Sequence, residues 1–471
     1  MAALVIVLAL FFDFTNGFHD TANAMATPIA TGAIKPKTAV ALAAALNLVG
    51  AFLSTEVAKT VSGGIIREGS DGVHITPEII FAGLMGAILW NMFTWLKGLP
   101  SSSSHALFGG LIGAAVVGIG VYSVNFDTVM LKVILPAVFA PVIAGGVAYI
   151  CTRLAYALTS RHDPETGDKL TQKRGGFRTG QIFTSSLVAL AHGTNDAQKT
   201  MGIITLVLIA SGTQPAGSGP EFWVIAACAL AIAIGTYSGG WRIIRTMGSG
   251  LTEVKPAQGF SAETSTAAAI LASSHLGFAL STTQVASGSV IGSGLGRKGT
   301  TVRWGMVGKI ATGWLFTLPA AAVVGALTAL LVGTGPVGTA IAIAFGIGTI
   351  VAMFVYSRKS HVSHANAVEV EEAGTAVRFQ KKKKASKAPQ GDEQRGPGMK
   401  WLELLQVAGA TLVSAVILVV LYSLGVRLTA IAADAEQKSP RLARSLAYLC
   451  FGACGAAVLF GIYLIVPYFS K

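Results

Sequence analysis

Two short motifs in this sequence each place an aspartate among polar neighbours inside an otherwise apolar segment. The first spans 16–26 and contains Asp20, and the second spans 192–202 and contains Asp196. A carboxylate at membrane depth costs about 2.5–3.5 kcal/mol on insertion scales, so such a residue usually serves a function. Because the two motifs resemble each other, the sequence favours a transporter built from two homologous halves.

The composition is that of a membrane protein. Of the 471 residues, 52% are hydrophobic and only 12% are charged, whereas a soluble domain has about 25% charged residues. Repeated apolar runs of roughly 20 residues predict an all-α polytopic fold within a lipid bilayer. The net charge of +13 lies mainly in the loops, which indicates membrane topology and no nucleic-acid partner. The four cysteines lie in apolar stretches and are expected to pack there.

The apolar segments divide into two sets of about five. Counting each segment as one crossing gives an odd number per half, so the two halves are predicted to have opposite orientations. The segment near 283–295 is short enough to be half of a re-entrant hairpin. The predicted parts are repeat 1 over 1–157, a basic loop over 158–180, repeat 2 over 181–332, a further helix over 333–357, a basic and disordered linker over 358–400, and a transmembrane hairpin over 401–471.

The distribution of Lys and Arg predicts the orientation of the chain. Loops on one side are basic, and the opposite loops over 120–128, 211–220 and 333–336 contain neither Lys nor Arg. By the positive-inside rule the basic loop and the linker face the cytoplasm, and Met1 lies outside. We expect a multi-pass protein of the plasma (inner) membrane.

Two hydroxyl-rich segments, 101–104 and 281–283, occupy equivalent places in the two halves. The paired aspartates are 176 residues apart, the hydroxyl segments 179, and a third pair (57–64 and 243–250) 186, which supports an internal duplication. Hydroxyl groups beside a helix break, together with free backbone N–H groups, can bind an oxyanion. Ser and Thr that only join helices remain the alternative.

The two aspartates cannot bind an anion directly. Two unit charges 4 Å apart interact by about 4 kcal/mol at an effective dielectric constant near 20. A proton or cation must therefore neutralise the carboxylates before the anion binds, which is itself a coupling mechanism. Glu263 is a third candidate for a cation or proton site, or else a helix cap. His19 is either a proton relay or a packed neutral histidine.

The motifs together resemble those of the PiT family of inorganic phosphate transporters. That family has a duplicated Gly-Ala-Asn-Asp-like signature, here over 17–20 and 193–196, and a proline, serine and histidine element, here over 100–105 and 279–284. The resemblance covers about residues 1–332. It implies an inverted-repeat secondary transporter with phosphate bound between the halves, near the bilayer midplane. Members with the 17–24 sequence form typically couple transport to protons and often carry a neutral metal–phosphate complex.

The resemblance gives two sets of expected site residues. Phosphate contacts are expected from Asn23, Ser102, Ser103, Ser104, His105, Asn195, Ser281, Thr282 and Thr283. Cation or proton coupling is expected from Asp20, Asp196, Glu263, Lys199 and His19. No cofactor is expected beyond the coupling ion, H⁺ or Na⁺, and a divalent metal that accompanies phosphate. No resident metal site is assigned, and a homo-oligomer is left open.

The second half departs from the family pattern in two respects. Ala279 and Gln284 stand where the family usually has Pro and His, and Lys199 stands where the first half has Asn23. We expect the Lys199 ammonium to replace a mobile cation or to pair with Asp196, which disfavours sodium. A sulfate permease, a sodium-coupled phosphate symporter and an anion channel are the alternatives. No HExxH motif is present, and an enzyme is not expected.

Overall fold

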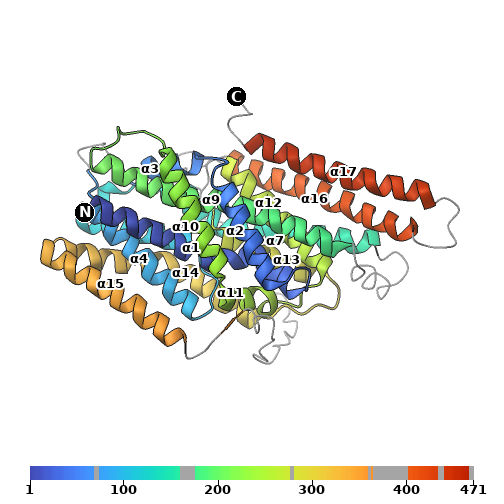
Figure 1. Ribbon diagram of the computed structural model, residues 1–471, viewed down its shortest axis with the longest axis horizontal. Coiled ribbons are helices and arrows are strands. Elements are labelled where there is room, and N and C mark those ends of the chain that lie inside the picture. The colour runs from blue at the N-terminus through green and yellow to red at the C-terminus, as the bar shows by residue number, and fades with distance from the viewer. Residues whose placement is uncertain are drawn as a thin grey trace, which may run out of the picture.

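Long apolar runs form long helices because backbone polar groups within lipid must be satisfied inside their own segment. The computed structural model describes residues 1–67, 74–159, 176–275, 280–358, 362–363, 401–432 and 440–465, and within these ranges it is helical apart from two isolated β-bridges. Seven helices are long and apolar enough to cross a membrane, or eight with the bent pair α10 and α11. The predicted all-α multi-pass fold is therefore confirmed (Figure 1).

Seven candidate spans account for most of the apolar sequence. They are α1 (Ala2–Ala30), α4 (Pro77–Leu96), α6 (Phe126–Val129) with its π-helical turn (Met130–Ile134) and α7 (Leu135–Thr159), α14 (Trp304–Val332), α15 (Pro336–Ser357), α16 (Trp401–Ala432) and α17 (Pro440–Ile465).

The remaining elements are shorter, more polar or bent. They are α2 (Pro36–Gly50), α3 (Glu56–Gly64), α5 (Ser103–Gly118), a 3₁₀ turn (Val121–Ser123), α9 (Phe177–Ala210), α10 (Phe222–Ser238), α11 (Trp241–Arg245) with a π-helical turn (Thr246–Gly250), α12 (Pro256–His275) and α13 (Thr282–Gly296). The bend between α10 and the α11 segment is 61°.

Two helices are too short to cross the bilayer alone. The segment near 283–295 is predicted to be short, and α13 has 15 residues. The prediction of a full crossing over 103–123 is wrong, because α5 has 16 residues and ends at Gly118. At about 1.5 Å per residue, such helices reach roughly 24 Å, less than the hydrocarbon core of about 30 Å. Counting one crossing per segment therefore does not hold.

The order of elements in the first half recurs in the second. α1 to α5 followed by α7 correspond to α9 to α13 followed by α14, and the isolated bridges Ile66–Val124 and Thr252–Val302 occupy matching places. The halves also interlock, since α5 packs on α14 and α13 packs on α7. The opposite orientation of the halves stays a prediction.

Glycines allow the interlocking helices to touch backbone to backbone. A Cβ at Gly113 of α5 would overlap the carbonyl oxygen of Ala322 in α14, and one at Gly292 of α13 would overlap that of Gly145 in α7. Close approach through small residues is the usual way in which helices associate in lipid. These contacts hold the N-termini of the two short helices in fixed positions inside the bundle.

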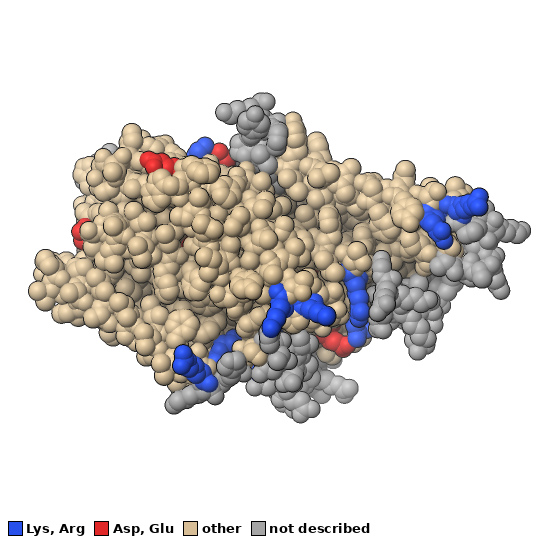
Figure 2. Space-filling view, in the orientation of Figure 1, with Lys and Arg blue, Asp and Glu red and all other residues tan. Residues whose placement is uncertain are grey.

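One end of the bundle is rich in basic residues. The guanidinium of Arg242 donates to the carbonyl oxygens of Leu96 (3.1 Å) and Ser357 (2.7 Å), so the C-terminal ends of α4 and α15 lie beside α11. Figure 2 shows most Lys and Arg side chains along the lower and right edges of the molecule and several acidic side chains at the upper left. This separation agrees with the predicted charge bias. Residues 160–175 and most of the 358–400 linker lie outside the described residues.

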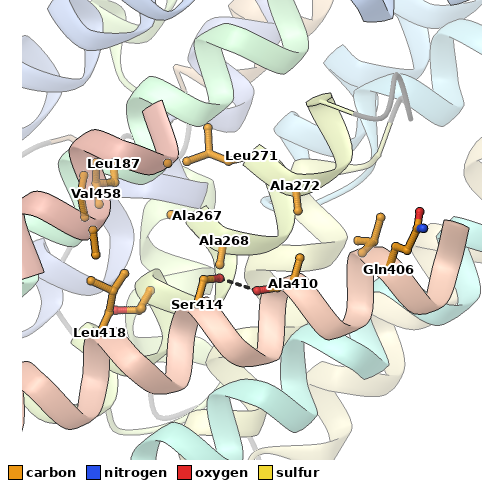
Figure 3. A pocket seen from close by; sticks show the side chains of 14 residues that line it. Leu187, Ala267, Ala268, Leu271, Ala272, Gln406, Ala410, Ser414, Leu418 and Val458 are labelled. Atoms are coloured by element: carbon orange, nitrogen blue, oxygen red, sulfur yellow. Dashed lines mark hydrogen bonds between the residues drawn. The ribbon is translucent and has the colours of Figure 1, made fainter. Parts of the chain in front are cut away.

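The C-terminal helices α16 and α17 pack on each other, and α16 also packs on α7 and α12. Between them and the bundle lies a cavity of about 380 Å³, lined by apolar residues such as Leu187, Ala267, Leu271 and Leu418 (Figure 3). Its Ser414 hydroxyl already donates to the backbone of Ala410. An apolar wall offers no compensation for a buried phosphate charge, so the anion site must lie elsewhere.

Candidate functional site

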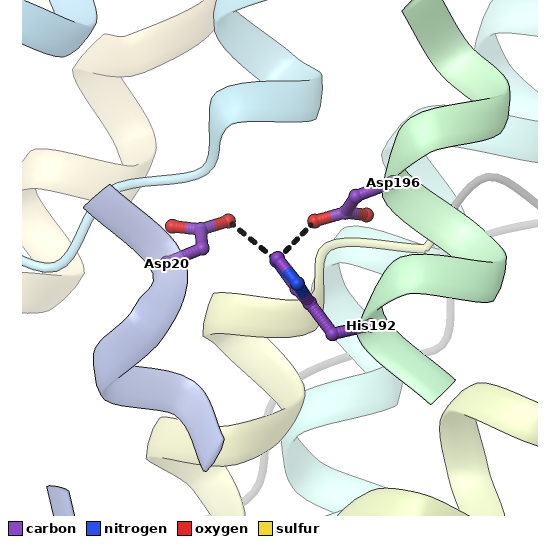
Figure 4. Close-up of side chains that lie close together, drawn as sticks. All are labelled: Asp20, His192 and Asp196. Carbon is purple, nitrogen blue, oxygen red and sulfur yellow. Dashed lines mark ion pairs between the residues drawn. The ribbon is translucent and has the colours of Figure 1, made fainter. Parts of the chain in front are cut away.

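A buried cluster at the centre of the bundle joins the two motifs. Nε2 of His192 lies 2.9 Å from a carboxylate oxygen of Asp196 and 3.8 Å from one of Asp20. Figure 4 shows the imidazole between the two carboxylates, one from α1 and one from α9. Asp20, His192 and Asp196 are each at most 2% exposed. The cluster is therefore closed to solvent from both ends of the bundle.

Lys199 binds the second carboxylate. Its ammonium forms an ion pair with Asp196 and donates to the Ser104 hydroxyl (2.6 Å) and to the Leu280 carbonyl oxygen (3.0 Å). The side chain is 1% exposed, so a charge that is normally hydrated is held entirely by protein oxygens. An ammonium has three N–H donors, and all three have acceptors here. Pairing with Asp196 is one of the two expected roles of this lysine.

The two hydroxyl segments begin the two short helices and meet at the cluster. Ser102 caps α5 by accepting from the His105 N–H (3.2 Å), and Ser281 caps α13 by accepting from the Gln284 N–H (3.3 Å). Ser/Thr residues at this position satisfy free N–H groups of the first turn. The caps thus orient two helix N-termini, whose partial positive charge favours anions.

Hydroxyls from the first turns of α5 and α13 donate to the two carboxylates. Ser103 and Thr283 each lie 3.1 Å from an oxygen of Asp20, and Thr282 lies 3.0 Å from Asp196. The Asn23 amide donates to Thr283 at 3.1 Å and to Thr282 at 3.3 Å. In this arrangement the carboxylates therefore hold the hydroxyl donors that an oxyanion would need.

His19 supports the first carboxylate from the side opposite to His192. Its Nδ1 lies 2.6 Å from Asp20, and its Nε2 lies 3.4 Å from the hydroxyls of both Thr94 and Ser101. Thr94 and Ser101 are themselves hydrogen-bonded to each other at 2.7 Å. A chain of exchangeable protons therefore leads from Asp20 toward α4.

Three of the expected residues lie away from the carboxylate pair. The His105 imidazole turns back to Ser102 (2.5 Å) and toward the Val133 carbonyl oxygen (3.5 Å). The Asn195 amide donates to Ser274 of α12 (2.9 Å). Both side chains act on the supporting helices rather than on the pair itself.

Glu263 forms a second polar cluster, separate from the first. Its carboxylate accepts from Thr27 (2.6 Å), Thr184 (2.7 Å) and the amide of Gln181 (3.1 Å). These donors come from α1 and α9, whereas Glu263 lies in α12. The carboxylate thus ties together the three helices that also carry the central cluster.

His192 is the most important residue that the site prediction omits. The sequence indicates it only as a histidine four residues before Asp196, which is also the spacing of a packed neutral side chain. Asn47 of α2 is a second omission, since its side-chain oxygen lies 3.3 Å from His192 Nδ1 and its amide donates to Thr236. Neither contact can be inferred from spacing, because the partners are 145 and 189 residues apart.

The donor atoms of the cluster suit hard and borderline cations. One ligand atom each from Asp20, His192 and Asp196 lies within 4.8 Å of the other two, and all three residues are buried. Carboxylate oxygen and imidazole nitrogen are common ligands of divalent metals. The same geometry serves protons equally, since an imidazole between two carboxylates can bind one. The cluster can hold positive charge beside two anion-favouring helix ends.

Comparison with known proteins agrees with this chemistry. A model of the phosphate transporter family matches residues 16–325, which include both aspartate motifs and both hydroxyl segments. A Mycobacterium leprae protein named "Probable low-affinity inorganic phosphate transporter" is 54% identical over 370 residues, 78% of this chain and 87% of the relative. A Bacillus subtilis protein of the same name is 39% identical over 69% of this chain and 96% of its own length.

A solved structure has the same fold. It is a sodium-dependent phosphate transporter with a TM-score of 0.62 and 24% identity, and the match covers 71% of this chain and 99% of that one. The described helices α16 and α17 lie beyond the family match. Since the family model spans well over half of the sequence and relatives above 50% identity share most of their length with it, this chain belongs to the phosphate transporter family.

Proposed function

We propose that this protein imports inorganic phosphate together with protons, by alternating access to the buried cluster of Asp20, Asp196, His192 and Lys199. The observation that carries the proposal is the Lys199 ammonium, which occupies a set of three oxygen acceptors beside Asp196. A carboxylate, a hydroxyl and a backbone carbonyl oxygen are the ligands that a hard cation such as sodium prefers. Because the ammonium already fills this set, protons remain as the mobile positive charge.

The charge of the cluster supports a requirement for protons. With both histidines neutral, Asp20, Asp196 and Lys199 sum to one negative charge. A phosphate anion brought to about 4 Å from an unneutralised carboxylate is repelled by about 4 kcal/mol at an effective dielectric constant near 20. A proton on His192 removes that charge, because its Nε2 faces both carboxylates. Phosphate then binds favourably only when protons are bound.

The first turns of α5 and α13 are the proposed phosphate contacts. Ser103, Thr282 and Thr283 donate to the carboxylates in the absence of substrate, and they become available when positive charge satisfies those carboxylates. Ser102 and Ser281 keep the helix N-termini directed at the site. A divalent metal carried with phosphate would meet Asp20, His192 and Asp196, so a neutral metal–phosphate complex is a plausible form of the cargo.

The burial of the cluster motivates alternating access. Charged groups at most 2% exposed can exchange with water only if the surrounding helices move. α5 and α13 each begin at the cluster and pack on the opposite half, so a shift between the halves would open either end. We further propose the plasma membrane as the location, with the basic end of the bundle in the cytoplasm and the N-terminus outside.

Uptake of labelled phosphate into proteoliposomes tests this proposal. Proton and sodium gradients are imposed separately, with and without Mg²⁺, and unlabelled sulfate is added as a competitor. We expect saturable uptake that a proton gradient drives and that persists without sodium. Uptake that needs a sodium gradient and ignores a proton gradient would overturn proton coupling, and would extend to this chain the sodium dependence of the solved relative. Strong competition by sulfate would favour a sulfate permease.

A channel mechanism is distinguished in the same vesicles. A carrier exchanges internal for external phosphate at equal concentrations, and its uptake saturates. A channel predicts a flux that rises with concentration and no acceleration by phosphate on the opposite side. Exchange without acceleration would contradict alternating access.

A further inference from the structure

α1 carries a stripe of polar residues that extends past the central cluster in both directions. Its members follow one another at spacings of three and four: Asp13, Asn16, Asp20, Asn23 and Thr27. Such spacings place residues on one face of a helix. Seven residues correspond to a rise of about 10.5 Å, so Asp13 and Thr27 lie about that far from Asp20, on opposite sides. Thr27 leads to Glu263, whereas Asp13 lies toward the end that carries Met1.

Asp13 differs from the other buried carboxyl groups of the described residues in its lack of hydrogen bonds. It is 0% exposed, and neither of its oxygens has a hydrogen-bond partner in the described part of the chain. Glu263, by contrast, accepts three hydrogen bonds. A buried carboxylate without a partner is costly, whereas the protonated acid is not. Asp13 therefore fits its surroundings when it carries a proton.

The groups around Asp13 lead back to the central cluster. Thr200 of α9 lies close to it, and His192, Asp196 and Lys199 of the same helix are within electrostatic reach. From α10, the Cys228 thiol is the titratable neighbour. On α1 itself, the next acid along the stripe is Asp20.

A polar layer separates Asp13 from the cluster. The Asn16 side-chain oxygen and the Thr200 hydroxyl also lack hydrogen-bond partners among the described residues. Asn16 is about one turn from Asp13 on the stripe, and Thr200 lies near the same carboxyl group. Several unpartnered polar atoms around one place are what an internal water needs, since it typically takes about three hydrogen bonds. Such a layer can pass a proton.

The duplication argues against a purely structural role for Asp13. The residue at its place in the second half is Ala189, at the offset of 176 that relates Asp20 to Asp196. Glu263 is equally unmatched, because the offset of the hydroxyl segments assigns it to Leu84. A residue needed for helix packing would serve both halves alike. The two unmatched carboxyl groups instead lie on opposite sides of the cluster along α1, as a proton route with two distinct ends requires.

We propose that Asp13 is a proton-binding site that connects the central cluster with the end of the molecule carrying Met1. The Asp13 carboxyl group releases its proton through the layer of Asn16 and Thr200 to the His192 imidazole. The carboxylate formed at Asp13 then takes a proton from water that enters from the Met1 end, so no group is oxidised or reduced. This inference rests on the proposed proton coupling and adds a residue and a direction to it.

Asp13→Asn tests the proposal, because asparagine has the same shape and cannot exchange a proton. Two activities are compared in proteoliposomes that contain a pH-sensitive dye. Proton-driven uptake should fall by about 100-fold, the order of loss typical for a positioned proton-transfer group. Exchange of internal for external phosphate needs no net proton movement and should stay close to that of the unmodified protein. Asp13→Glu should restore proton-driven uptake, and the exposed Asp127→Asn should leave both activities unchanged.

Each outcome bears on one proposal or the other. If the unmodified protein shows no proton movement with phosphate, the proposed proton coupling fails regardless of Asp13. If the unmodified protein is proton-driven and Asp13→Asn is equally so, the Asp13 proposal alone is overturned. Loss of exchange and of driven uptake together, in a variant that still elutes as a folded species, would assign Asp13 a structural role and would also overturn it.

Discussion

The Lys199 ammonium and the Asp196 carboxylate form an ion pair one helical turn apart on α9, and both side chains are closed to solvent. In the first half of the chain the place of Lys199 is taken by Asn23, which donates to Thr282 and Thr283 instead. The two halves therefore present different charges to one central site. Removal of one partner from a buried pair typically costs about 3–5 kcal/mol, so this difference is firmly built into the fold.

Lys199→Asn should give phosphate uptake a sodium dependence. Removal of the ammonium frees the Asp196 carboxylate, the Ser104 hydroxyl and the Leu280 carbonyl oxygen, and sodium can bind such oxygens. Uptake is measured in proteoliposomes with a sodium gradient and no proton gradient. The exposed Lys59→Asn is the control, since its ammonium pairs only at the surface with Glu56. Uptake that stays indifferent to sodium in a folded Lys199→Asn protein would contradict the assigned role.

Asp20→Asn should abolish coupled uptake and leave the protein inserted in the membrane. The substitution removes the charge that His19 and His192 face but keeps the Lys199–Asp196 pair. Asp196→Asn alone would strand the buried ammonium, so the informative second variant is Asp196→Asn combined with Lys199→Asn. Uptake assays and membrane fractionation check both. Driven uptake at the unmodified rate in either variant would refute the coupling assignment of that carboxylate.

Thr282→Val should weaken phosphate binding more than it slows transport. Its hydroxyl donates to Asp196, accepts from Asn23 and lies at the N-terminus of α13. A buried partner left without its hydrogen bond costs about 1–3 kcal/mol, which corresponds to a rise in KM of about 5- to 150-fold. Thr312→Val is the control, because that exposed hydroxyl bonds only to its own helix. A KM equal to that of the control would remove Thr282 from the site.

Gly292→Ala should destabilise the protein without touching the cluster. The added methyl group would overlap the carbonyl oxygen of Gly145, and both helices resist displacement because their backbones are in contact. Overpacking of this kind costs about 1–3 kcal/mol. Gly313→Ala is a matched control, since nothing lies within 4 Å of its Cβ position. Thermal unfolding in detergent should give a lower midpoint for Gly292→Ala only, and equal midpoints would disprove the close contact.

The fold class was predictable from the sequence because lipid allows few solutions. Apolar runs of the right length, the recurrence of the aspartate motifs and the absence of basic residues from alternate loops all follow from backbone satisfaction and charge placement. The length of α5 was not predictable, since an apolar run continues past Gly118 where the helix ends. Hydropathy measures whether a segment tolerates lipid, and it does not measure where tertiary contacts stop a helix.

The site was only partly predictable for a similar reason. The aspartates and hydroxyl residues could be found because they are polar groups in apolar surroundings that recur at fixed offsets. The grouping of Glu263 with Thr27, Thr184 and Gln181, rather than with Asp20, depends on how α12 packs. His192 and Asn47 meet only because α2 lies against α9. Spacing predicts the face of a helix, and it cannot predict which other helix covers that face.

A positive charge fixed to the polypeptide has an electrical consequence. A mobile cation at the place of Lys199 would cross the membrane with each phosphate and would add its charge to the electrical work of transport. The Lys199 ammonium stays with the chain and returns with it. Since one elementary charge moved across 100 mV is worth about 2.3 kcal/mol, the protein gives up roughly that much driving force per phosphate. In return, accumulation of phosphate depends less on the membrane voltage and more on the pH difference.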